Sequence, residues 1–231
     1  MAPAVNFLEL LGGGVVPEVL VGTWIVMGLL LIFAWLARGA LMRAADPIVP
    51  DEGVSIRAIA DFAVDQLDGF VEAVLGHHDY REFVPFFGTL FLFILACDFF
   101  GLIPGMEPPT GNSDLTFALG ATTFGFYIYE GFRANGFLGY LRSFLGPVLF
   151  LAPLMLPIEL ADNLFRPFSL GVRLYANMFA DHTVLGIFTG LTYVGFPVAF
   201  YMLGAIVCVI QAVIFMVLSM SYVRLAQSHE H

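Results

Sequence analysis

Several apolar runs in this sequence are long enough to cross a lipid bilayer. An α-helix needs about 20 residues to span roughly 30 Å of hydrocarbon, and the first such run covers residues 17–41. The whole chain is 59% hydrophobic and 12% charged, with a mean hydropathy of +0.88. Alternation of apolar and polar residues, which a membrane β-barrel requires, is absent. The sequence therefore predicts an all-α integral membrane protein.

Charges and turn residues divide this single membrane domain, residues 1–231, into about five membrane-crossing helices and one surface helix. Residues 147–224 contain no polar loop, only a weak break at residues 190–197, so they predict a long hairpin of two helices. The other crossing helices are expected at residues 17–41, 82–103 and 115–132.

Two of these segments are not expected to stand upright in the membrane. Residues 55–75 place apolar side chains on one face and Arg57, with four acids, on the other, which predicts an amphipathic helix on the inner membrane surface. Residues 157–190 would measure about 50 Å as a straight helix, so this part of the hairpin must be tilted, bent or partly in the membrane plane.

The arginines predict the orientation of the chain. All nine basic side chains are arginine, and Arg43 and Arg133 follow spans that end on the same side. The segment before the first span and the loop at residues 106–114 contain no arginine. Because basic residues collect on the cytoplasmic side, we expect the N-terminus outside and the C-terminus in the cytoplasm. The N-terminus lacks the basic region of a signal peptide, so the first run is expected to be a retained span.

Arg173 is the residue of the hairpin whose placement in the membrane costs the most free energy. It lies in the apolar stretch of residues 168–179, where an arginine costs at least about 3 kcal/mol and cannot lose its proton. No acid lies within one helical turn of it, so its counter-charge is expected to come from elsewhere, for example another subunit. Helical spacing puts six polar residues within roughly 40° of one line. These residues, here called the polar line, are Glu159, Asp162, Arg166, Ser169, Arg173 and Asn177.

Other polar residues in the apolar segments have two readings each. Arg166 and Asp162, four residues apart, fit an ion pair that stabilises the helix as well as a place in a pathway. Gln211 fits an interhelical hydrogen bond or, facing the polar line, an ion pathway. Asp98 is expected to be protonated or paired, with a structural or a functional role.

The sequence lacks the motifs of several function classes. Nucleotide-binding loops, dinucleotide fingerprints, nucleophile elbows and metal-ligand spacings are missing, and the sparse arginines do not form a nucleic-acid footprint. Cys97 and Cys208 lie in apolar stretches, where they are expected to be small buried side chains. We therefore expect no cofactor, no metal, no nucleic-acid partner and no bond-making chemistry by this polypeptide alone.

The polar line also carries a family resemblance. The stretch Arg166-Pro-Phe-Ser-Leu-Gly-Val-Arg-Leu-Tyr-Ala-Asn-Met178, followed by Ile210-Gln-Ala-Val-Ile-Phe-Met-Val-Leu218, closely resembles the subunit a family of F-type rotary ATP synthases. Residues 87–105 resemble the second-span motif of that family, and Pro157-Ile-Glu159 its lead-in to the long helix. The resemblance covers essentially residues 83–225.

The resemblance implies a stator subunit, in a bacterial inner membrane, that carries ions between two offset half-channels. Its hairpin would pack against a rotating ring of c subunits, each with a mid-membrane carboxylate, and other partners would be peripheral-stalk b subunits and the rest of the complex. Matched by position, Arg173 is the essential arginine, Asn177 and Gln211 accompany it, and Glu159 belongs to the inner access path. We interpret Asp162 and Ser169 as further members of the pathway.

One position departs from the family pattern. The family usually has a carboxylate nine residues after the arginine, in the outer half-channel, whereas this chain has His182 there and Asp181 one residue earlier. Some relatives with His at this position carry a Glu on the last helix where this chain has Gly204. We therefore assign the outer relay to Asp181 and His182 jointly.

Two other function classes fit a membrane protein with a buried arginine. A secondary transporter would use the midplane arginine to bind an anionic substrate, but it predicts broken helices and paired repeats, which the sequence lacks. A scaffold protein would leave the polar line without a purpose. Within the family reading, the coupling ion, H⁺ or Na⁺, and the ring stoichiometry depend on the ring.

Overall fold

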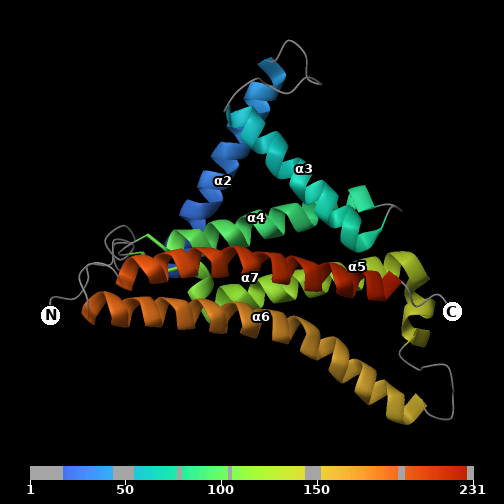
Figure 1. Ribbon diagram of the computed structural model, residues 1–231. Coiled ribbons are helices and arrows are strands. Elements are labelled where there is room, and N and C mark those ends of the chain that lie inside the picture. Colours follow the sequence, from blue (N-terminus) through green and yellow to red (C-terminus); the bar gives the residue numbers. More distant parts are fainter. Residues whose placement is uncertain are drawn as a thin grey trace. The chain divides into compact units, whose positions relative to one another are not determined.

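The computed structural model describes six parts of the chain, residues 18–43, 55–76, 80–103, 106–143, 152–191 and 196–227. Throughout these parts the regular structure is helical (Figure 1). The elements are α2 (Glu18–Arg43), α3 (Ile56–Leu75), η1 (Tyr80–Glu82), α4 (Val84–Gly101), η2 (Pro109–Gly111), α5 (Ser113–Ser143), α6 (Ala152–Leu191) and α7 (Phe196–Gln227). The helices group into two compact units, Met1–Pro109 and Thr110–His231.

The first unit contains α2, α3 and α4. Val26 of α2 packs against Cys97 and Phe100 of α4 in a buried apolar cluster. The helix α3 begins where the Ser55 side chain accepts a hydrogen bond from the backbone N–H of Ala58 at 3.1 Å, which satisfies one of the open donors of the first turn. Apolar side chains of α3 remain exposed, as a helix on a membrane surface requires; they include Ile56, Ile59 and Phe62.

The position of Arg57 differs from the prediction for the polar face of α3. The sequence places it among exposed acids, but its side chain is buried, 4% exposed. Its Nε lies 3.4 Å from the Asp61 carboxylate, and this ion pair offsets the charge while the aliphatic stem is covered. The helix itself agrees with the predicted residues 55–75.

The second unit contains α5, α6 and α7, and it holds the polar line. Gly120 of α5 meets the backbone of α6, because a Cβ at Gly120 would lie 2.7 Å from the carbonyl oxygen of Pro167. A Cβ at Gly171 would in turn lie 3.2 Å from the carbonyl oxygen of Thr116. Glycine at both positions therefore lets the two helices cross at backbone contact. Asn135 of α5 donates a hydrogen bond of 2.9 Å to the carbonyl of Ala226, which ties α5 to α7.

Both hairpin helices are long, and α6 is bent. It contains Pro157 and Pro167, and each proline lacks the N–H that would bond to the carbonyl four residues earlier. Figure 1 shows the resulting curvature, with the first turns of α6 directed away from α7. The bend agrees with the expectation that this segment is too long to cross the bilayer as a straight upright helix.

The helix ends agree with the sequence for most elements, and α5 is the exception. It runs to Ser143 rather than ending near residue 132, with a kink at Gly136, whose φ of 69° is favourable only for glycine. Within the break predicted at residues 190–197, α6 ends at Leu191 and α7 begins at Phe196; residues 192–195 lie outside the described residues, as do residues 144–151.

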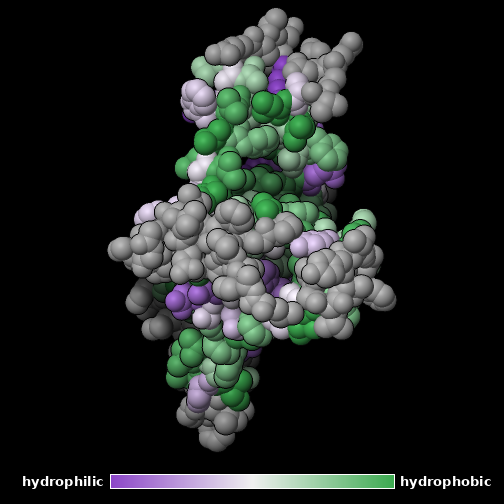
Figure 2. All heavy atoms as spheres, turned by 90° about the vertical axis from the view of Figure 1, so that its left-hand side faces the viewer, coloured by the Kyte–Doolittle hydropathy of each residue, from purple (hydrophilic) through white to green (hydrophobic). Residues whose placement is uncertain are grey.

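Three of the described helices are long and apolar enough to cross a membrane. They are α2 at Val19–Met42, α4 at Val84–Gly101 and α7 at Val198–Gln227. The helices α5 and α6 do not reach this apolarity because polar side chains are spread along both. Hydrophobic residues cover much of the coloured surface in Figure 2, and Trp35 of α2 is 74% exposed. Such an exposed apolar surface is expected where the surrounding medium is lipid.

Candidate functional site

The polar line of α6 lies beside the buried face of that helix. The buried positions are Asn163, Leu170, Gly171, Leu174 and Met178, which face the other two helices of the unit. Glu159, Arg166, Arg173 and Asn177 are half-buried at the edge of this face, and Asp162 and Ser169 are exposed. The line predicted from helical spacing is therefore present, and one side of it is left open by the described chain.

Arg173 is half-buried, with its guanidinium at the edge of the buried face of α6. Within the described parts of the chain, no residue forms a hydrogen bond or an ion pair with it. The neighbouring positions Ser169, Val172 and Ala176 are exposed, so the guanidinium lies next to the open side of α6. This geometry agrees with the expectation that its counter-charge lies outside the chain.

Asn177 and Gln211 are brought together across the hairpin. The Asn177 side-chain amide donates a hydrogen bond of 2.5 Å to Oε1 of Gln211, which is 2% exposed. The contact confirms an interhelical hydrogen bond for Gln211. The Nε2 of Gln211 is buried and has no hydrogen-bond partner among the described residues, so its two N–H groups can still donate hydrogen bonds.

Arg166 is held inside the chain, in contrast to Arg173. Its guanidinium forms an ion pair with the Asp162 carboxylate, as the i, i+4 spacing predicts. The guanidinium carbon also lies 6.0 Å from the ring centre of Tyr127 and 5.6 Å from that of Tyr222, within the range of cation–π attraction. These contacts favour the structural reading of Arg166, whereas the Asp162 side chain is 57% exposed.

Three residues of this cluster are not among the residues predicted from the sequence. Tyr127 donates a hydrogen bond to the side-chain oxygen of Asn163, and Tyr222 covers Arg166 from α7. A signal for Tyr127 exists in the spacing of α5, where the buried polar residues recur at helical intervals of seven, four and three positions. They are Thr116, Thr123, Tyr127 and Glu130.

Asp181 and His182 lie further along α6 and are both half-buried. The Oδ2 atom of Asp181 is buried and has no hydrogen-bond partner in the described parts of the chain, so it can accept a hydrogen bond from water or a transferred proton. Gly204 of α7 is buried and brings no titratable group to this end of the hairpin. Joint service of Asp181 and His182 as a relay stays a prediction.

The remaining predicted residues fall elsewhere. Asp98 belongs to α4 in the first unit, where it is 1% exposed. Cys97 and Cys208 are both buried, as expected for small apolar side chains. Among the described residues, His, Cys, Asp and Glu do not gather in threes in a way that would hold a metal ion.

Comparison with known proteins places these features in a family. The model of the family described as ATP synthase A chain matches residues 20–224. An ATP synthase subunit a of Bdellovibrio bacteriovorus is 43% identical over 195 residues, which are 84% of this chain and 85% of that protein. One from Solibacter usitatus is 36% identical over 208 residues, 90% of this chain and 88% of that protein. The chain, with Arg173 and the Asn177–Gln211 pair on its hairpin, therefore belongs to the ATP synthase A chain family.

Proposed function

We propose that this chain is the stator subunit a of a bacterial F-type ATP synthase, and that Arg173 separates two half-channels for the coupling ion. Membership of the family and the similarity to bacterial subunits a support a role inside an ATP synthase complex. The proposal rests mainly on the charge, the burial and the contacts of Arg173. It is a permanent cation, half-buried on the open side of α6, and it has no ionic partner in the described chain.

The missing partner of Arg173 is a carboxylate on a passing c subunit. A fixed positive charge favours the ionised form of a carboxyl group that comes near it. Each ring carboxyl would therefore release its ion as it reaches Arg173 and take up another after passing it. Because arginine keeps its charge at every relevant pH, it would also repel cations and prevent a direct leak between the half-channels.

The polar residues on either side of Arg173 supply the two half-channels. Glu159, with Asp162 and Ser169, lies toward the start of α6 and would form the inner path. Asp181 and His182 lie toward its end and would form the outer path. The Asn177–Gln211 hydrogen bond lies one turn from Arg173 and would hold α7 against α6 beside the exchange point.

The partners and orientation follow from the same reading. The tilted hairpin would pack against the c-subunit ring, and peripheral-stalk b subunits would hold the stator still. The single membrane domain would cross the bacterial inner membrane about five times, with α3 on its cytoplasmic surface, the N-terminus outside and the C-terminus in the cytoplasm. The positions of arginine in the sequence support this orientation.

Replacement of Arg173 tests the proposal. Arg173→Ala is expected to abolish ATP-driven ion uptake by the complex reconstituted in vesicles, without preventing assembly, because the fixed charge that ionises the passing carboxyl is then lost. Arg38→Ala, which removes an exposed arginine of α2, is the matched control and is expected to retain uptake. Coupled uptake at the wild-type rate by assembled Arg173→Ala complexes would overturn the proposal.

A further inference from the structure

The hydroxyl group of Tyr127 connects α5 to two positions of α6. It donates a hydrogen bond to the side-chain oxygen of Asn163 and accepts one of 3.5 Å from Nη1 of Arg166. Asn163 in turn donates its amide to the carbonyl of Glu159 at 2.9 Å. Tyr127 and Asn163 are nearly fully buried, 5% and 6% exposed. One hydroxyl therefore fixes two side chains that lie a turn apart on α6.

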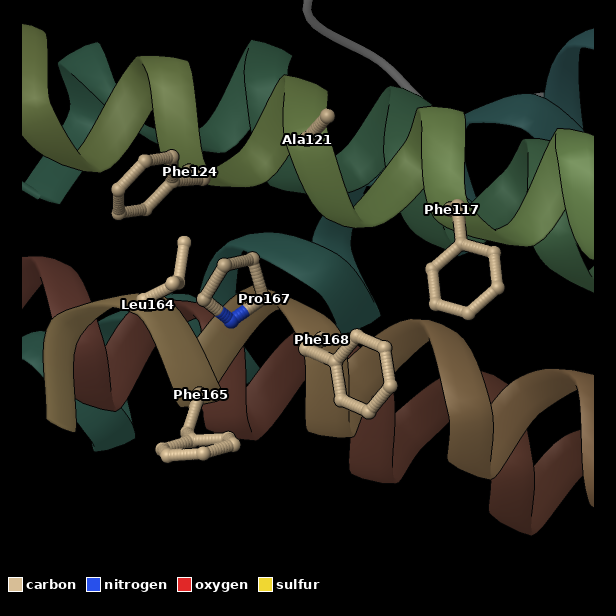
Figure 3. Close-up of a pocket in the computed structure, with 7 residues that line it drawn as sticks. All are labelled: Phe117, Ala121, Phe124, Leu164, Phe165, Pro167 and Phe168. Carbon is tan, nitrogen blue, oxygen red and sulfur yellow. The ribbon is translucent and has the colours of Figure 1, made fainter. Parts of the chain in front are cut away.

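The opposite flank of α6 does not supply comparable packing. An apolar groove of about 410 Å³ lies between α5 and α6. Figure 3 shows Phe124, Leu164 and Pro167 facing into it, while Phe165 is directed away from α5. Leu164 and Phe165 are more than 60% exposed. The groove leaves part of this flank of α6 without close packing, and the hydrogen bonds of Tyr127 add to the contacts that oppose a rotation of the helix.

The direction of Arg173 depends on the same rotation. Arg166 and Arg173 are seven residues apart, which is about two turns and about 20° of azimuth on an α-helix. Between them, the backbone contacts of Gly120 with Pro167 and of Gly171 with Thr116 hold α6 against α5. Arg173 lies on the same continuous helix as Asn163 and Arg166, so a rotation of α6 about its axis would change the direction of Arg173.

We propose that Tyr127 is a positioning residue for ion translocation, whose hydroxyl sets the rotation of α6 and so the direction in which Arg173 faces the ring. The inference rests on the proposed function of Arg173. Tyr127 does not touch the ion in this mechanism. It acts through Asn163 and Arg166, and the Asp162 ion pair keeps Arg166 from competing with Arg173 for a passing carboxylate.

Tyr127→Phe tests the inference in the assembled complex, because it removes the hydroxyl and keeps the ring that covers Arg166. Tyr129→Phe is the matched control, since Tyr129 lies two residues further on α5 and is 60% exposed. Tyr127→Phe is expected to assemble and to lower ATP-driven ion uptake between about 3-fold and 100-fold, in line with the sensitivity of reactions to misplacements of up to 1 Å. Tyr129→Phe is expected to leave uptake unchanged.

A geometric measurement separates positioning from a general structural role. In complexes that carry Asn177→Cys with Gln211→Cys, the rate of disulfide formation between α6 and α7 reports the rotation of α6 and does not require ion transport. Adding Tyr127→Phe is expected to change this rate at least about twofold, and adding Tyr129→Phe is not. Loss of uptake by Tyr127→Phe with an unchanged cross-linking rate would overturn the inference, as would wild-type uptake.

A second variant keeps the test decisive if Tyr127→Phe assembles poorly. Asn163→Leu removes the acceptor of the same hydrogen bond at similar volume and is expected to reproduce both the lower uptake and the altered cross-linking. Wild-type values of both for Asn163→Leu would refute the positioning role. The two experiments test different claims. Normal uptake by Arg173→Ala would refute the proposed function, and it would do so whatever the cross-linking rate shows about the rotation of α6.

Discussion

At the scale of single residues, Arg166 and Arg173 share one face of α6 and differ in what surrounds them. Each costs at least about 3 kcal/mol at bilayer depth as a permanent cation. The cost of Arg166 is offset within the chain by Asp162 and by the rings of Tyr127 and Tyr222. That of Arg173 is not offset by any described residue. This difference separates a structural arginine from one that is available to a partner.

The Asn177–Gln211 hydrogen bond leads to a prediction at the same scale. Asn177→Leu and Gln211→Leu are each expected to lower ATP-driven ion uptake, because each leaves the other amide, half-buried at Asn177 and buried at Gln211, without its partner. The double variant is expected to lose less than the sum of the two effects. The coupling in a double-mutant cycle should be about 0.6 to 2 kcal/mol, the range for interhelical hydrogen bonds in membranes.

Uptake rates in vesicles, normalised to the amount of assembled complex, measure this coupling. Additive effects of the two substitutions would show that the amides act independently, against the contact across the hairpin. Ser169→Ala combined with Gln211→Leu is a suitable control pair, since Ser169 is exposed on α6 and is expected to show additivity.

At the scale of helices, the crossing of α5 and α6 decides how the polar line is presented. Glycines at positions 120 and 171 allow backbone contact between the two helices, and small residues are typical of such close crossings in membranes. Pro167 lies at the crossing and removes one hydrogen bond from α6. The helix can therefore bend there without losing its contact with α5.

Substitution of Gly120 tests this crossing. Gly120→Ala is expected to destabilise the second unit by about 1 to 3 kcal/mol, the usual cost of overpacking, because the added methyl would meet the carbonyl of Pro167 at 2.7 Å. The midpoint of thermal unfolding in detergent and the amount of chain retained in membranes measure the effect. Both should fall.

Gly125→Ala on the same helix provides the matched control. A Cβ at Gly125 meets no atom within 4 Å, so this variant should only gain helix propensity, at most about 1 kcal/mol. Equal behaviour of Gly120→Ala and Gly125→Ala would contradict a close crossing of α5 and α6.

At the scale of the whole molecule, the lengths of the apolar helices and the positions of the arginines indicate an integral membrane protein. Three of the described helices could span it by length and apolarity, whereas α5 and α6 carry buried or half-buried polar groups along their length. Helices of this second kind are tolerated in membranes when their polar faces meet protein or water rather than lipid. In the proposed function, ions would pass along these polar groups of α5 and α6.

The proposed orientation can be measured with single cysteines. Glu107→Cys lies in the segment between α4 and η2 and Ala134→Cys lies near the end of α5, and both positions are exposed. A membrane-impermeant maleimide should label Glu107→Cys in right-side-out vesicles and Ala134→Cys only in inverted ones. The parent chain is the control, because Cys97 and Cys208 are buried. The reverse labelling pattern would invert the proposed topology.

Much of the fold and part of the site could be predicted because they depend on local order along the chain. The polar line follows from helical spacing alone, and so does the pairing of Arg166 with Asp162. Tyr127 and Asn163 were missed because their contact joins residues 36 positions apart; the spacing of α5 marks Tyr127 as a buried position but does not name its partner. The burial of Arg57 was missed for a similar reason, since its spacing on α3 matches that of exposed acids.

The sequence by itself determined that the protein is surrounded by lipid, that it is helical, and that Arg173 is the cation whose burial in the membrane costs the most free energy. These properties follow from the transfer free energies of side chains and from backbone hydrogen bonding in lipid, neither of which depends on which helices meet. Only the tertiary structure decided which polar groups are paired. It joins Asn177 to Gln211 and Arg166 to Tyr127 and leaves Arg173 on an open side, because pairing depends on how neighbouring helices cross and rotate.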